Sequence, residues 1–235
     1  MPAETSEELA KAIMALPCPV IFLDTAALLD LLRAPYRSDV DEAVLASCVD
    51  LVEDLTTNPR KVWVVITDAV VHEVQDNLER VSNELKNNIR SLRRMLTTAR
   101  TLFPERDITV HDWLEAHLFD RVLGVMSRLQ SSSMVFSGGD ACMANANRRL
   151  FAGRAPSARS KQQYKDCLIF EEFLELARHL RSAGFLGSLV FVTPNKVDYG
   201  RPPVGADDIA DDLQQVSGLY CSNITWAMAS IRGHS

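Results

Sequence analysis

The stretch PVIFLDT, residues 19–25, passes abruptly from apolar side chains to a carboxylate. The run is too short for an independent helix and contains β-branched Val20 and Ile21, so it predicts a strand buried on both faces of a parallel sheet. Asp24 then lies at the carboxyl end of this strand. Ligands and catalytic groups collect at that edge of open α/β sheets, so we asked which other acids reach it.

Strands and helices alternate along most of the chain. Further strands are expected at Val62–Thr67, Ser188–Thr193 and, at one edge, Leu219–Cys221. Helices are expected at or near residues 1–16, 26–33, 41–55, 68–96, 113–129, 140–151, 166–184, 206–216 and 224–231, with Asp68 as the N-cap of the long one. This order predicts an α/β fold with a mainly parallel central sheet flanked by helices. One domain over residues 1–235 is expected, with a helical elaboration at about 82–155 that contains no strand.

Composition places the chain among globular proteins. Hydrophobic residues make up 47% and charged residues 24%, and no apolar run is long enough to cross a bilayer. Three glutamates in the first eight residues argue against a secretory signal, so we expect a cytoplasmic protein without a membrane segment. The five cysteines are scattered and form no C-x-x-C pair, which disfavours zinc ribbons and dithiol chemistry.

Four segments far apart in the sequence send polar oxygens to the edge where Asp24 lies. Glu73 is near the start of the helix after the second strand, and Asp166 opens the helix before the third. Asn195 and Asp198 follow that third strand. Clustered carboxylates repel one another unless a cation or protons compensate, and oxygen ligands suit Mg²⁺ or Mn²⁺. The chemistry that this cage predicts is metal-assisted hydrolysis of phosphodiester bonds.

These segments resemble the four signatures of PIN-domain nucleases. They are Asp24-Thr25 after a strand, a helix with Glu73, Lys165–Ile169 at a helix start, and Val192–Tyr199. The resemblance covers about residues 20–226 and is closest to the larger PIN-like proteins with a helical insertion. It implies a metal-dependent nuclease that binds one or two Mg²⁺ or Mn²⁺ ions and cleaves RNA, often as the toxin of a toxin and antitoxin pair.

The resemblance also assigns roles by position. Asp24, Glu73 and Asp166 match the first three acids of the family. Asn195 holds a place often occupied by an acid, with Asp198 three residues later, so Asn195, Asp198 or both can reach the metal. Thr25 matches the hydroxyl that steadies the first acid or the attacking water. The implied partners are RNA or single-stranded DNA and an antitoxin or other inhibitory protein; a homodimer is one option for the oligomeric state.

Two acid-free basic runs point to phosphate binding despite a net charge of -6. Residues 141–165 contain Arg148, Arg149, Arg154, Arg159, Lys161 and Lys165, and residues 85–104 contain Lys86, Arg90, Arg93, Arg94 and Arg100. The candidates for phosphate contacts are Lys165, Lys161, Arg159, Arg93 and Arg94. Alternatively, the runs are solvated helix faces or an interface for an acidic protein.

Other interpretations remain open at this point. Asp24 and Asp166 could simply cap their helices. The fold could serve as a catalytically inactive module that binds nucleic acid or protein, which Asn195 favours. A haloacid-dehalogenase-like phosphatase needs a second acid two residues after Asp24, where Ala26 stands. Solvated surface charges are expected at Glu171, Glu172, Asp207, Asp208, Asp211 and Asp212.

Overall fold

Five parallel strands form the centre of the protein in the order β3-β2-β1-β4-β5. The computed structural model describes residues 4–38, 40, 43–104, 113–157 and 163–233. The strands are β1 (Val20–Leu23), β2 (Trp63–Thr67), β3 (Met134–Phe136), β4 (Leu189–Val192) and β5 (Gly218–Cys221). Every residue of β1, β2 and β4 is buried, because helices cover both faces of the sheet. The expected α/β class with a mainly parallel sheet is confirmed.

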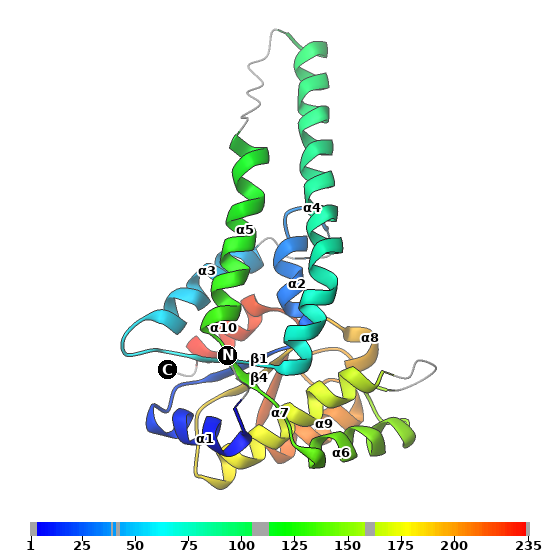
Figure 1. Ribbon diagram of the computed structural model, residues 1–235. Helices are drawn as coiled ribbons and strands as arrows, with labels where there is room; N and C mark the ends of the chain where they lie inside the picture. The colour runs from blue at the N-terminus through cyan, green and yellow to red at the C-terminus, as the bar shows by residue number, and fades with distance from the viewer. Residues whose placement is uncertain (1–3, 39, 41–42, 105–112, 158–162, 234–235) are drawn as a thin grey trace.

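Two layers of helices enclose the sheet (Figure 1). Helices α2, α3 and α10 lie on one side of it, α1, α7 and α9 lie on the other, and α6 packs against α7. The helices are α1 (Ser6–Ala15), α2 (Thr25–Arg33), α3 (Ala43–Thr56), α4 (Asp68–Leu102), α5 (Trp113–Ser132), α6 (Asp140–Phe151), α7 (Tyr164–Ser182), α8 (Lys196–Tyr199), α9 (Asp207–Gln215) and α10 (Ile224–Arg232). None of the described helices combines the length and the apolar character needed to span a membrane.

The expectation that no strand lies between residues 82 and 155 is wrong. β3 pairs in parallel with β2 through Met134, Val135 and Phe136 and forms one edge of the sheet. It is only three residues long, and Met134 and Val135 are half-buried. Such a short segment after a long helix carries no periodic signal of its own.

Two helix starts differ slightly from the prediction. Thr67, rather than Asp68, is the N-cap of α4, and its hydroxyl oxygen accepts a hydrogen bond from the Val70 N–H at 3.3 Å. Helix α7 begins at Tyr164, two residues before the expected start at Asp166, so Asp166 lies in its first turn.

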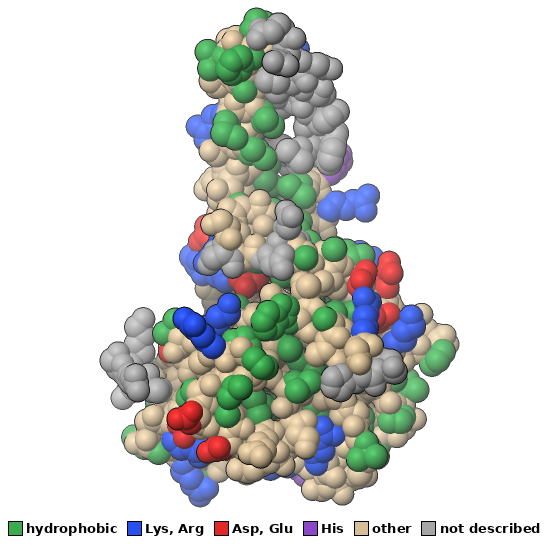
Figure 2. Space-filling model, turned by 180° about the vertical axis from the view of Figure 1, so that it is seen from behind, with side chains coloured by type: hydrophobic (Ala, Val, Ile, Leu, Met, Phe, Trp, Pro, Cys, Tyr) green, Lys and Arg blue, Asp and Glu red, His purple; other side chains and the backbone are tan. Residues whose placement is uncertain are grey.

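Helices α4 and α5 form a hairpin that projects from the domain (Figures 1 and 2). With 35 residues, α4 is about 50 Å long. Its buried side chains end at Ile89, and later apolar residues such as Met95 and Leu102 are more than half exposed. The first part of α4 therefore belongs to the domain core, and the rest extends beyond it.

The order of the strands reverses between β1 and β4. The chain proceeds from β1 to β2 and β3 on one side, then returns to add β4 and β5 on the other. In open parallel sheets, such a reversal leaves a crevice beyond the carboxyl ends of the two central strands, where ligands bind.

Candidate active site

Asp24 lies at the carboxyl end of β1, where hydrogen bonds hold both its backbone and its carboxylate. Its backbone N–H donates to the Val192 carbonyl at 3.0 Å. One carboxylate oxygen accepts the Thr25 N–H and the other accepts the Thr193 hydroxyl, both at 2.6 Å. Only 4% of Asp24 is exposed, and this burial raises its pKa to about 6, against the lowering effect of the two hydrogen bonds that its carboxylate accepts. Asp24 is thus both the N-cap of α2 and a carboxylate fixed at the crevice.

Thr25 connects the start of α2 to α4. Its hydroxyl donates a hydrogen bond to the Glu73 carboxylate at 2.9 Å. Glu73 lies in the second turn of α4 and is half-buried. Residues 48 positions apart in the sequence are therefore joined directly, and the carboxylate of Glu73 is oriented by Thr25.

Asp166 has the most strongly perturbed carboxylate of the predicted set. Its pKa is raised to about 7, first by burial and then by the negative charges of Asp24, Glu73 and Asp198; Lys165 opposes this shift. The Tyr199 hydroxyl donates to the Asp166 carbonyl at 3.0 Å and ties the first turn of α7 to α8. Like charges raise a pKa in this way only when they lie close together, so all four predicted acids occupy the same neighbourhood.

Asn195 and Asp198 form a pair after β4. Asn195 is the N-cap of α8, and its side-chain oxygen accepts the Asp198 N–H at 3.3 Å. Its amide nitrogen donates to the Asp198 carboxylate at 2.8 Å. The asparagine therefore positions Asp198 and faces the other acids together with it.

A cavity of about 260 Å³ brings these side chains together. Five of the six predicted site residues line it, namely Asp24, Thr25, Glu73, Asp166 and Asn195. Asp198 joins them through its hydrogen bond to Asn195. Side chains from four separate segments of the chain thus converge between β1 and β4, where the order of the strands reverses.

The donor set around this cavity fits a hard divalent cation. It consists of carboxylate and amide oxygens, which Mg²⁺ and Mn²⁺ prefer, and a positive ion would relieve the repulsion that raises the pKa of Asp166. In the described ranges, however, no group of three or more His, Cys, Asp or Glu side chains is arranged to hold a metal ion. Asp24 and Glu73 already accept hydrogen bonds from threonines and an amide. Metal binding would require these carboxylates to turn or to share those partners.

Three contributors to the site were missed in the sequence. Arg33 and Asn77 line the cavity, and Thr193 orients Asp24. Asn77 follows Glu73 by one helical turn, so its position could have been recognised from i,i+4 spacing. Arg33 ends α2 and Thr193 directly follows β4, and their approach to the acids depends on how the elements pack.

The predicted phosphate contacts are distributed unevenly. Lys165 is exposed beside Asp166, as expected for a substrate contact. Arg93 and Arg94 are exposed on the projecting part of α4, about 30 Å along the helix from Glu73. Arg159 and Lys161 lie outside the described residues. Lys165 is therefore the described candidate nearest the acids.

Several charges expected at the surface are buried instead. Glu171 and Glu172 are 5% and 3% exposed, because α7 packs against other elements around much of its circumference. The Arg149 guanidinium, counted among the basic surface charges, donates to Glu171 at 2.8 Å and also pairs with Asp212. Arg149 is 3% exposed and Asp212 is 6% exposed. This ion pair network joins α6, α7 and α9 and is not a free basic surface.

The family assignment follows from this combination of fold and site. A family model described as PIN domain matches residues 21–199, more than half of the chain, from β1 to α8. All six predicted site residues fall within this span. Comparisons with curated proteins and with solved structures gave no match. PIN domains are typically nucleases and typically use divalent metal ions. The chain therefore belongs to the PIN-domain family, as its sequence motifs predicted.

Proposed function

We propose that this protein is a divalent-metal-dependent nuclease that hydrolyses phosphodiester bonds in RNA as an endoribonuclease. The observation that carries the proposal is the convergence of four carboxylates from four segments, which raises the pKa of Asp166 to about 7 through burial and the three other acids. A buried acidic cluster costs free energy and, in a cleft, indicates a functional site.

The ligands in this proposal are Asp24, Glu73, Asp166 and Asp198. When bound there, Mg²⁺ or Mn²⁺ supplies an activated water and neutralises charge on the leaving oxygen. The surrounding residues position the ligands: Thr193 and Thr25 orient Asp24 and Glu73, and Asn195 holds Asp198. Lys165 is the proposed phosphate contact next to the acids.

A catalytically inactive binding module is the second candidate. The observation in its favour is Asn195, which lines the cavity at a position where the family often has an acid. Such a module would still bind nucleic acid but would not depend on the charge of Asp24 or Asp166.

RNA cleavage with purified protein tests the proposal. Structured and single-stranded RNA, together with single-stranded DNA, are incubated with Mn²⁺ or with a chelator. We expect cleavage of RNA with Mn²⁺ only. Asp166→Asn should lose at least about 100-fold, because mutating even an outer-shell partner of a metal site typically costs about 10–100-fold and Asp166 is a proposed ligand.

Matched variants separate the site from general effects of charge. Asp211→Asn, at an exposed position of α9, is the control for Asp166→Asn. Glu79→Gln, at an exposed position of α4, is the control for Glu73→Gln. Both controls should cleave as the wild type does. Cleavage in chelator, or full activity of Asp166→Asn, would contradict the nuclease proposal.

The remaining expectations about partners follow from the family resemblance alone. An antitoxin or other inhibitory protein and a homodimer stay predictions. Co-purification of the chain with a small inhibitory protein that abolishes RNA cleavage would support the toxin-type role.

A further inference from the structure

A second cavity adjoins the acidic one. It has a volume of about 450 Å³ and shares three lining residues with the acidic cavity, namely Ala26, Arg33 and Asn195. No residue of this second cavity except Asn195 was among the candidates from the sequence. Because both cavities open at the carboxyl ends of β1 and β4, a chain-like ligand can extend from one into the other.

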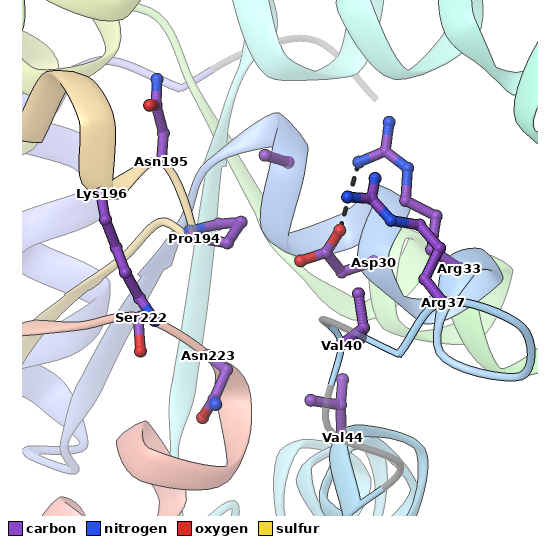
Figure 3. A pocket seen from close by; sticks show the side chains of 11 residues that line it. Asp30, Arg33, Arg37, Val40, Val44, Pro194, Asn195, Lys196, Ser222 and Asn223 are labelled. Carbon is purple, nitrogen blue, oxygen red and sulfur yellow. Dashed lines mark hydrogen bonds and ion pairs between the residues drawn. The ribbon is translucent and has the colours of Figure 1, made fainter.

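Figure 3 shows that two sets of side chains face each other across this cavity. Asp30, Arg33 and Arg37 come from α2 and the turn after it, next to Val40 and Val44. The opposite wall carries residues that follow β4 and β5, namely Pro194, Asn195, Lys196, Ser222 and Asn223.

The charges of the two cavities are opposite in sign. The described lining of the second cavity has three cations, Arg33, Arg37 and Lys196, and one carboxylate, Asp30. Asp30 pairs with the Arg33 guanidinium at 3.2 Å, which fixes the arginine where the two cavities meet. Asp39, Asp41 and Glu42 of the neighbouring sequence lie outside the described residues and are not counted.

The lining combines the contacts that a nucleotide needs. Arg and Lys side chains neutralise phosphates, and guanidinium planes also stack on bases. Val40, Val44 and Pro194 offer apolar surface, and Ser222 and Asn223 have polar groups for a sugar or base edge. The volume falls in the range of about 300–1,000 Å³ that is usual for small-ligand sites. A base that is paired in a duplex cannot enter such a cavity, but an unpaired base can.

We propose that this second cavity is a subsite that holds an unpaired nucleotide next to the phosphodiester bond that is cleaved. Arg33, Arg37 and Lys196 are positioning residues for its phosphate. The inference rests on the proposed nuclease function for the identity of the neighbouring site. It selects single-stranded nucleic acid as the substrate and gives the chain a substrate contact closer to the acids than Arg93 and Arg94.

Binding without cleavage tests the subsite directly. Fluorescently labelled single-stranded RNA and DNA of one sequence, and the matching duplexes, are titrated with the full chain in chelator while anisotropy is measured. The test variant is Arg37→Gln with Lys196→Gln, both exposed and outside the acidic cavity. The control, Lys11→Gln with Arg128→Gln, removes the same charge from exposed positions of α1 and α5.

We expect the test variant to bind single strands at least tenfold more weakly and the control to stay within twofold of the wild type. Losing two phosphate contacts should also reduce the slope of log affinity against log salt by about 1.4. The wild type should bind duplexes more weakly than single strands, and the test variant should bind duplexes as well as the wild type does. RNA and DNA arms report whether the subsite distinguishes the two sugars.

Equal binding by the test variant and the wild type would overturn the subsite. An equal loss in the control, or in the duplex arms, would also overturn it because the effect would then be general electrostatics.

Cleavage by the wild type with Mn²⁺ is measured in parallel. If single-strand binding depends on Arg37 and Lys196 but the wild type cleaves nothing, the nuclease proposal is rejected and the subsite is retained. If the wild type cleaves RNA and the test variant cleaves it equally well, the subsite is rejected and the nuclease proposal is retained. Thermal unfolding of each variant verifies that the fold is intact.

Discussion

At the scale of residues, the candidate site is organised by hydroxyl groups as much as by acids. Thr193 donates to Asp24 and Thr25 donates to Glu73, at 2.6 and 2.9 Å. Thr193 directly follows β4, and Thr25 begins α2 just after the neighbouring strand β1. They fix the directions of two carboxylates that repel each other, a repulsion that adds to the raised pKa of Asp24.

Thr25→Val tests this positioning role. Valine has nearly the same shape as threonine but cannot donate to Glu73, so we expect RNA cleavage to fall at least tenfold while the protein remains folded. Thr25→Ser keeps the hydroxyl and should retain most of the activity. Initial cleavage rates of the two variants decide the matter, and equal rates would show that the hydrogen bond does not matter.

Glu172 is a buried acid away from the proposed ligands, and its charge makes stability depend on pH. Burial raises its pKa from 4.5 to about 7, against a 2.9 Å hydrogen bond from the Gly138 N–H. The folded state thus disfavours the carboxylate. The destabilisation is absent below pH 4.5, grows between pH 4.5 and 7, and is complete above pH 7.

Glu172→Gln should therefore raise the free energy of unfolding by about 3 kcal/mol at pH 8.5 and leave it nearly unchanged at pH 4.5. Urea unfolding at the two pH values measures this difference. Glu79→Gln, at an exposed position of α4, serves as the control and should change neither value. A gain that is the same at both pH values would contradict the assignment.

At the scale of elements, the sequence predicted what local pattern determines. β1, β2 and β4 were predicted because uninterrupted apolar runs are typical of strands buried on both faces. β3 was missed because a strand of three residues is too short to show a pattern. Glu171 and Glu172 were assigned to the surface because position on a helix gives direction around the axis, but not how many neighbours surround that helix.

The network at Arg149 shows how elements depend on one buried charge. Arg149→Ala leaves Glu171 and Asp212 without their buried cation, so we expect a loss of about 3–5 kcal/mol in the free energy of unfolding. Arg148→Ala removes an exposed neighbour on the same helix and should cost less than about 0.5 kcal/mol. Denaturant unfolding of both variants compares them; a similar small effect for the two would contradict a structural role for Arg149.

Helix α4 should tolerate substitutions differently along its length. Leu85 is 1% exposed and packs in the core, whereas Met95 is 62% exposed on the projection. Leu85→Ala should cost about 2–5 kcal/mol, and Met95→Ala should change the free energy of unfolding by less than about 0.5 kcal/mol. Comparable losses at the two positions would mean that the projection is packed as tightly as the core.

At the scale of the whole molecule, the topology explains why distant residues meet. Asp24, Glu73 and Asp166 could be predicted as a group because parallel strands share one carboxyl edge, where their loops and helix starts gather. Asn77 could have been recognised from its i,i+4 spacing to Glu73. Arg33 and Thr193 could not be predicted in the same way, since their approach depends on the packing of α2 and β4. The second cavity, formed after β1, β4 and β5, likewise arises only from the assembled sheet.

The central claim is that these converging acids bind one kind of ion, and calorimetric titration of the metal-free protein with Mn²⁺ tests it most directly. We expect saturable binding by the wild type and by Asp211→Asn, and a loss of at least tenfold in affinity for Asp24→Asn and Asp166→Asn. Binding that is equally strong in all four proteins, or absent from the wild type, would contradict the claim.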